Sequence, residues 1–155
     1  MLQRLCNLLV DKTLTISVAE SCTGGLLSAT FTEIAGSSNY FKGAVVAYSN
    51  EVKHHILNVP QEILNTYGAV SSQTAQEMLH GCKGLFATDI VCVTTGIAGP
   101  DGGTSEKPVG TVFIGVQYHE INIIEKCLYK GDRGDIRRAT VDKVISMIIE
   151  VLERQ

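Results

Sequence analysis

Three short apolar runs constrain this fold most, because each is followed by a turn rich in glycine or serine and then by a helix-like segment. The runs are Leu14–Val18, Gly43–Tyr48 and Asp89–Thr94. A short run that is apolar throughout is typical of a strand buried between two layers. We therefore predict three such strands, and we expect Gly43–Tyr48 to be covered on both faces.

The remaining segments have the apolar spacing of helices, followed late in the chain by a hairpin. We expect helices over residues 2–12, over 26–34 with an end at Gly36, from Asn50 to Ile56, from Pro60, from Ser71 or Ser72 to Phe86, and from Gly131 and Asp132 to Leu152. The hairpin pairs Val109–Gln117 with Ile121–Leu128. This order predicts an α/β fold, a three-layer α/β/α sandwich on a mixed β-sheet, in a single domain over residues 1–155.

Composition and charge exclude several classes of protein. Hydrophobic residues make up 45% and charged residues 19% of the chain, which indicates a packed core. A net charge of −3 argues against a nucleic-acid partner, and the absence of a run of about 18 apolar residues argues against a membrane span. The five cysteines form no C-x-x-C pair, and the four histidines form no metal-binding pattern. We expect no metal, free thiols and a cytoplasmic chain.

The first candidate motif, AESCTGG, lies directly after the first strand and opens a helix. A strand-to-helix turn presents Ser21 and Thr23 at the carboxyl edge of the sheet, where α/β proteins bind ligands. The helix N-terminus offers N–H groups to an anion, and Gly24 and Gly25 let a ligand approach the backbone. Alternatively, Ser21 or Thr23 is only an N-cap. Cys22 is either a nucleophile or a small buried hydrophobe.

The second motif, YSNEVK, lies at the exit of the second strand. If Asn50 is the N-cap, Lys53 lies in the first helical turn, where the helix dipole favours the neutral amine and so a general base. A charged His54 would add to that effect. The alternative is a solvated surface lysine beside Tyr48, a tyrosine that closes the edge of the core.

Two later motifs have the composition of anion-binding segments. The loop TTGIAGPDGG contains Thr95, Gly96 and Gly99, whose backbone can form a nest for an anion or an ordinary turn. The motif GDRGDIRR places Arg137, Arg138 and a third arginine at a helix start. These arginines either bind an anion or pair with the two aspartates of the same motif.

Together, the motifs AESCTGG, GAVVAYSNEVK, GAVS, TGIAGPDGGTSEKPVGTV and GDRGDIRR resemble the CinA C-terminal domain, the nicotinamide-nucleotide amidase family, from Leu5 to Leu152. The resemblance implies hydrolysis of nicotinamide mononucleotide to nicotinate mononucleotide and ammonia, without a cofactor. It implies Ser21, Tyr48 and Lys53 as catalytic residues. The expected substrate-binding residues are Thr23, Gly24, Gly25, Asn50, Thr95, Gly96, Gly99, Arg137 and Arg138.

The chemistry that this resemblance implies is coherent for these side chains. Neutral Lys53 would take the proton of Ser21, directly or through Tyr48, and backbone N–H groups near Thr23 and Gly24 would hold the oxyanion. Arg133 and Arg137 lie four residues apart on one helix face, so at most two of the three arginines can serve one phosphate. We expect a small-molecule nucleotide as the ligand and a homo-oligomeric assembly. The alternative function is a non-catalytic nucleotide-binding regulatory module.

Overall fold

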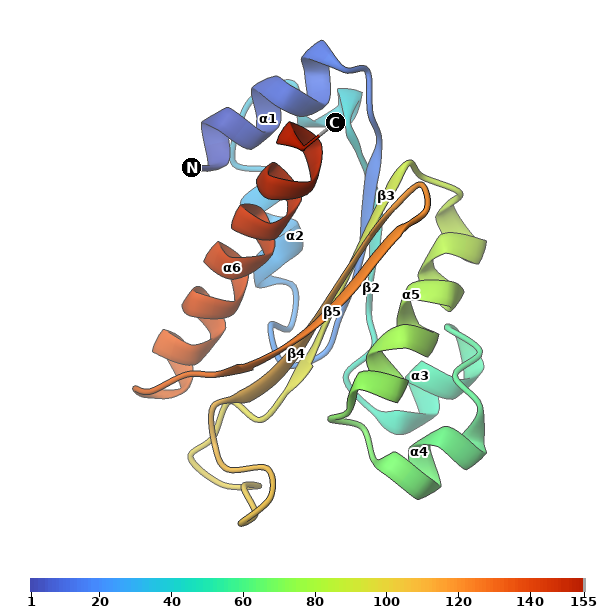
Figure 1. The fold of residues 1–155 in the computed structure, drawn as a ribbon, viewed down its shortest axis with the longest axis vertical. Helices are drawn as coiled ribbons and strands as arrows, with labels where there is room; N and C mark the ends of the chain where they lie inside the picture. The colour runs from blue at the N-terminus through green and yellow to red at the C-terminus, as the bar shows by residue number, and fades with distance from the viewer. Residues whose placement is uncertain (155) are drawn as a thin grey trace.

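A computed structural model describes residues 1–154 as a five-stranded sheet with helices on both sides (Figure 1). Its elements are α1 (Leu2–Asp11), β1 (Ile16–Glu20), α2 (Leu26–Phe31), the 3-10 helix η1 (Ser37–Asn39), β2 (Phe41–Val46), α3 (Asn50–His55), α4 (Gln61–Tyr67), α5 (Ser72–Phe86), β3 (Ile90–Gly96), β4 (Thr111–Tyr118), β5 (Ile121–Leu128) and α6 (Arg133–Glu153). Within these residues, no helix is both long and apolar enough to cross a membrane.

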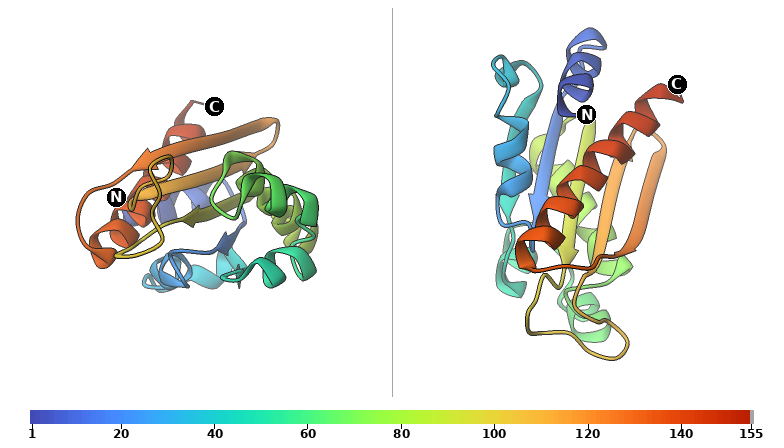
Figure 2. Two further views of the ribbon diagram at one scale, coloured as in Figure 1. Left: turned by 90° about the horizontal axis from the view of Figure 1, so that it is seen from below. Right: turned by 90° about the vertical axis from the view of Figure 1, so that its left-hand side faces the viewer.

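The helices divide into two layers, as the ribbon shows (Figures 1 and 2). Helices α1, α2 and α6 cover one face of the sheet, and their apolar side chains share a buried cluster with Ile16, Val18 and Cys92. Helices α3, α4 and α5 cover the other face, where Ala19 and Val93 join a second cluster. Neighbouring strand residues therefore point to opposite cores. The predicted three-layer α/β/α sandwich on a mixed sheet is confirmed.

The strand order β2-β1-β3-β4-β5 creates a crevice at the carboxyl ends of the parallel strands. Strands β2, β1 and β3 run parallel, whereas β4 and β5 run antiparallel to their neighbours. After β1, the chain adds β2 next to one side of β1, and it later adds β3 next to the opposite side of β1. Ligands of open α/β sheets bind where the strand order reverses in this way, at the carboxyl ends of the strands. The β3–β4 connection extends beyond the carboxyl ends of these strands (Figure 2).

The first two strands differ from their predicted positions. Strand β1 begins at Ile16, because the N–H of Leu14 still donates to the Leu9 carbonyl at the end of α1, and it continues through the buried Glu20. Strand β2 ends at Val46, and both its faces are covered only in part, since Phe41 and Ala44 pack against the first cluster and Val45 packs against the second. Its place at the sheet edge is the reason, since one side has no neighbouring strand.

A close backbone approach fixes α5 against the segment that follows α3. A Cβ atom built on Gly81 of α5 would lie 1.9 Å from the carbonyl oxygen of Leu57, far inside van der Waals contact. The same segment is joined to α3 by a hydrogen bond from the Val59 N–H to the Lys53 carbonyl, at 3.0 Å. Helix α3 is thereby held at a set distance from α5, and with it the side chain of Lys53.

Candidate functional site

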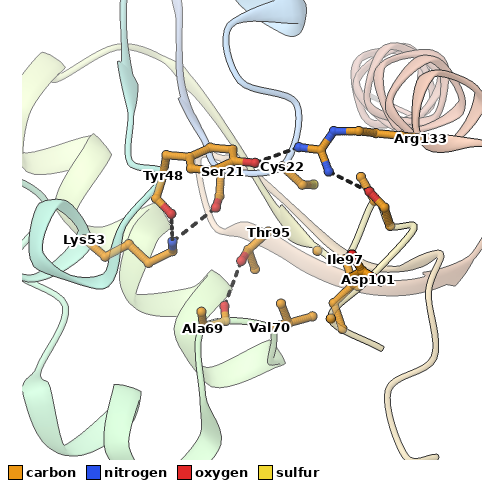
Figure 3. A pocket seen from close by; sticks show the side chains of 14 residues that line it. Ser21, Cys22, Tyr48, Lys53, Ala69, Val70, Thr95, Ile97, Asp101 and Arg133 are labelled. Carbon is orange, nitrogen blue, oxygen red and sulfur yellow. Dashed lines mark hydrogen bonds between the residues drawn. The ribbon is translucent and has the colours of Figure 1, made fainter. Parts of the chain in front are cut away.

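A pocket opens at the carboxyl ends of β1 and β3, at the reversal of strand order (Figure 3). Its lining comes from the end of β3, from the segments after β1, β2 and β3, from α3, from the α4–α5 connection, and from the first turn of α6. The lining residues are Ser21, Cys22, Tyr48, Lys53, Ala69, Val70, Thr95, Gly96, Ile97, Ala98, Gly99, Asp101, Gly102 and Arg133. All three predicted catalytic residues lie in this pocket.

Lys53 and Ser21 meet on the pocket wall (Figure 3). The Lys53 Nζ lies 3.1 Å from the Ser21 Oγ, and it donates to the carbonyl of Ala47 at 2.9 Å and to that of Tyr48 at 3.4 Å. A neutral amine has two N–H groups and one lone pair. The two carbonyls can take the N–H groups, which leaves the lone pair for the serine hydroxyl.

Burial is what favours the neutral form of Lys53. Its side chain is only 1% exposed, and among residues 1–154 it makes no salt bridge. Desolvation lowers the pKa of Lys53 from 10.5 to about 8. Burial is thus the main cause, rather than the helix dipole and the charged His54 that the sequence suggests; the His54 Nδ1 lies 2.8 Å from the Val59 carbonyl. A lysine with this pKa can act as a base near neutral pH.

The N-terminus of α2 is already occupied by a carboxylate from the chain itself. The buried Glu20 accepts hydrogen bonds from the N–H groups of Gly25, Leu27 and Ser28, at 2.8–3.1 Å, and from the Ser28 hydroxyl. The prediction that this helix end offers unpaired N–H groups to a substrate anion is therefore wrong for Gly25. The glutamate in the AES motif could have indicated this, because an acidic residue near a helix N-terminus often stabilises its free N–H groups.

The turn before α2 still presents two unused backbone donors. Among residues 1–154, the N–H groups of Cys22 and Thr23 donate to no backbone carbonyl, whereas the Gly24 N–H donates to the Ser21 carbonyl at 3.0 Å. The Thr23 side chain is buried against Thr94, with 2.8 Å between the two hydroxyl oxygens. Of the expected oxyanion donors, Thr23 thus keeps a free N–H and Gly24 does not.

Arg133, one of the three arginines considered for a phosphate, closes one side of the pocket (Figure 3). Its guanidinium donates to the Tyr48 hydroxyl at 2.7 Å and to the Gly99 carbonyl at 2.8 Å. Gly99 has φ +77, and a Cβ there would lie 2.4 Å from the Val109 side chain. The Tyr48 hydroxyl is thus held by Arg133, and Lys53 contacts Ser21 directly rather than through the Tyr48 hydroxyl.

The other two arginines have structural partners. Arg137 donates to the Thr23 carbonyl at 2.7 Å and so ties α6 to the turn after β1. Arg138 is exposed, pairs with Asp135 at 2.8 Å, and lies outside the pocket lining. Asp135 also completes a capping box with Asp132. Position in the helix separates the three arginines, because helical side chains lean toward the N-terminus and only Arg133 lies in the first turn.

The remaining predicted binding residues divide into two groups. Thr95, Gly96 and Gly99 line the pocket, and the Thr95 hydroxyl holds the Ala69 carbonyl at 2.7 Å. Asn50 does not line it, nor do Thr23, Gly24, Gly25, Arg137 and Arg138. Asn50 is also not the N-cap of α3, since the Ser49 hydroxyl accepts from the Val52 N–H at 3.2 Å.

No three histidine, cysteine, aspartate or glutamate side chains gather into a metal-binding group within residues 1–154. The five cysteines are free, and four of them are buried. Cys22 lines the pocket beside Ser21, and burial raises the pKa of its thiol to about 11. At neutral pH this cysteine is protonated and a poor nucleophile.

Comparison with known proteins places this chain in one family. The CinA C-terminal domain model matches residues 1–152. A CinA-like protein of Dictyoglomus turgidum is 52% identical over 86% of the chain, and one of Thermotoga maritima is 51% identical over 84%. These matches cover 33% and 32% of the relatives, so the chain spans about a third of their length.

Solved structures extend the similarity to the whole fold. The competence/damage inducible protein CihA from Agrobacterium tumefaciens is 40% identical with a TM-score of 0.94, and the match covers 98% of this chain and 93% of that one. A CinA superfamily protein from Klebsiella pneumoniae is 30% identical with a TM-score of 0.95, and the match covers 99% and 96%. With a family match over nearly its full length, this chain belongs to the CinA C-terminal domain family.

Proposed function

We propose that this chain is an amidohydrolase that converts nicotinamide mononucleotide to nicotinate mononucleotide and ammonia. One observation carries the proposal: the buried Lys53, with a pKa lowered to about 8, lies 3.1 Å from the Ser21 hydroxyl in an open pocket. A serine with a neutral amine at hydrogen-bond distance is an activated nucleophile. The choice of substrate rests on the resemblance of the motifs to the amidase family.

In the first step, the Lys53 Nζ takes the proton of Ser21 while the Oγ attacks the carboxamide carbon. The direct contact between the two residues supports transfer without a relay. Tyr48 supports the step differently, because its carbonyl accepts from Nζ and its hydroxyl is held by Arg133. We therefore assign Tyr48 to the positioning of the base rather than to proton transfer.

The tetrahedral intermediate has a negatively charged oxygen that needs hydrogen-bond donors. The Cys22 N–H lies immediately after the nucleophile, and Cys22 lines the pocket, so this group is suited to the role. Donors fixed in the turn before a helix need no reorganisation during the reaction, and each is typically worth about 10²–10³ in rate. The sequence suggested Thr23 and Gly24 for this role, but neither residue lines the pocket.

Protonated Lys53 then returns its proton to the leaving nitrogen, so that ammonia departs and an ester to Ser21 remains. A water molecule attacks this ester as Lys53 takes a proton from it. Lys53 returns the proton to the Ser21 Oγ, and nicotinate mononucleotide is released. The same amine thus acts as base and acid in both halves, which suits a pKa of about 8.

Arg133 is the residue we propose for the phosphate of the substrate. Its exposed guanidinium uses two of its five N–H groups on Tyr48 and Gly99, so others remain for an anion at the pocket mouth. Arg137 and Arg138 are engaged elsewhere. The glycine-rich loop after β3 supplies the facing wall.

The experiment that tests this function is ammonia release from nicotinamide mononucleotide by the purified chain in excess EDTA. We expect turnover by the wild type and none by Ser21→Ala, with nucleotide binding to Ser21→Ala retained in calorimetry. Binding without turnover by the wild type would favour the alternative, a nucleotide-binding regulatory module. Equal turnover by both proteins would exclude Ser21 as the nucleophile.

A further inference from the structure

Asp101 is the one carboxylate on the pocket lining within the described residues (Figure 3). It lies on the loop after β3, on the opposite side of the pocket from Tyr48 (Figure 3). Arg133, a permanent cation, also lines the pocket and donates to the Tyr48 hydroxyl. The Asp101 side chain is exposed and forms no salt bridge with any of residues 1–154. The pocket therefore carries two opposite fixed charges, and the negative one has no ionic partner in the protein.

The fold does not need the Asp101 carboxylate, because the backbone on both sides of it is held by other contacts. The Gly99 carbonyl accepts from Arg133, and the Ile97 N–H donates to the Thr111 carbonyl at 2.8 Å. The Gly110 N–H returns to the Ile97 carbonyl at 2.8 Å. Removing the negative charge should therefore leave the loop in place.

We infer that Asp101 selects substrates whose amide is carried on a positively charged ring, a quaternary pyridinium. This inference rests on the proposed function and deepens it. In such a substrate the ring nitrogen is meta to the carboxamide, so the positive charge lies within one ring width of Ser21 when the amide reaches it. With phosphate at Arg133 and pyridinium at Asp101, the pocket matches a zwitterion.

The test compares two nucleotides that differ in ring charge and share ribose and phosphate. These are nicotinamide mononucleotide and its reduced dihydropyridine form, which has a neutral ring. Calorimetry on Ser21→Ala measures both dissociation constants without turnover, first alone and then with Asp101→Asn added. We expect Asp101→Asn to lower the preference for the charged ring by about fivefold, the upper range for an exposed ion pair.

Two variants separate ring recognition from general electrostatics. Asp101→Glu keeps the charge and should keep most of the preference. Asp142→Asn removes an equal charge from the exposed surface of α6, outside the pocket, and should leave the preference unchanged. An equal weakening of both nucleotides by Asp101→Asn would mean contact with ribose, and no change in either would mean no contact. Both results overturn the inference.

Ammonia release distinguishes failure of this inference from failure of the proposed function. A charge preference that depends on Asp101, without ammonia release by the wild type, supports the inference and refutes the amidase. Ammonia release with a preference that survives Asp101→Asn supports the amidase and refutes the inference. Absence of nucleotide binding and turnover refutes both.

Discussion

Replacing Lys53 with methionine tests whether burial of the lysine amine lowers the free energy of unfolding of the protein. Methionine resembles the lysine stem in shape but carries no ionisable group. Lys53 is 1% exposed, and desolvation lowers its pKa from 10.5 to about 8. Folding therefore makes protonation of this amine less favourable, and the free energy of unfolding of the wild type must depend on pH in a defined way.

The sign follows from proton counting. Between pH 8 and 10.5 the unfolded chain binds more protons at Lys53 than the folded chain does, so the free energy of unfolding rises with pH. The penalty is present in full below the folded pKa and disappears above the unfolded one. At pH 7 it amounts to about 3 kcal/mol, and by pH 10 it has fallen to about 1 kcal/mol.

The assay is guanidinium unfolding of wild type and Lys53→Met, followed by circular dichroism at pH 7 and pH 10. The stability of the variant relative to the wild type should fall by about 2 kcal/mol between these two pH values. Other titrating groups are the same in both proteins and cancel. Lost hydrogen bonds to Ala47 and Tyr48 shift the difference at both pH values alike. A difference that does not change with pH would refute the assignment of a depressed Lys53 pKa.

Three further predictions concern the site. The kcat/KM for ammonia release should rise with pH and level off above about 8, and Lys53→Arg should be nearly inactive because arginine stays protonated; an active arginine variant would contradict Lys53 as the base. Cys22→Ala should retain most activity, and iodoacetamide at pH 7 should label Cys22 slowly, since its thiol pKa is raised to about 11; rapid labelling with loss of turnover would point to Cys22 as the nucleophile. Arg133→Ala should lower kcat/KM for the nucleotide, relative to the riboside that lacks phosphate, by roughly 10- to 150-fold, whereas Arg138→Ala should not; equal effects of the two variants would remove Arg133 from the phosphate site.

The sequence predicted the part of the site that depends on strand ends. Ser21 follows β1 and Thr95 lies near the end of β3, and parallel strands bring their carboxyl ends together, so their meeting in the pocket could be foreseen. The lysine was also found, but the reason for its low pKa was not. Burial of Lys53 depends on how α3 packs against the rest of the fold, and the six-residue motif YSNEVK does not contain that information.

What the sequence did not predict depends on side-chain partners distant along the chain. The contact of Arg133 with Tyr48 joins residues 85 positions apart. The predicted strand ended at Val18, so Glu20 was counted in the turn after it, whereas its carboxylate is buried by the helix that it caps. Asp101 was interpreted only as a turn residue, since turn propensity and a place on a pocket wall are compatible with the same letters.

The contact between Gly81 and the Leu57 carbonyl makes the candidate site sensitive to a residue far from it in sequence and absent from its lining. Even the single methyl group of alanine cannot fit there, so α5 and the segment after α3 would have to separate. That segment is hydrogen-bonded to the Lys53 carbonyl, so a shift of α3 would also change the distance between the Lys53 amine and the Ser21 hydroxyl. The absence of a side chain at position 81 therefore helps to set the geometry of a contact between two residues that Gly81 never touches.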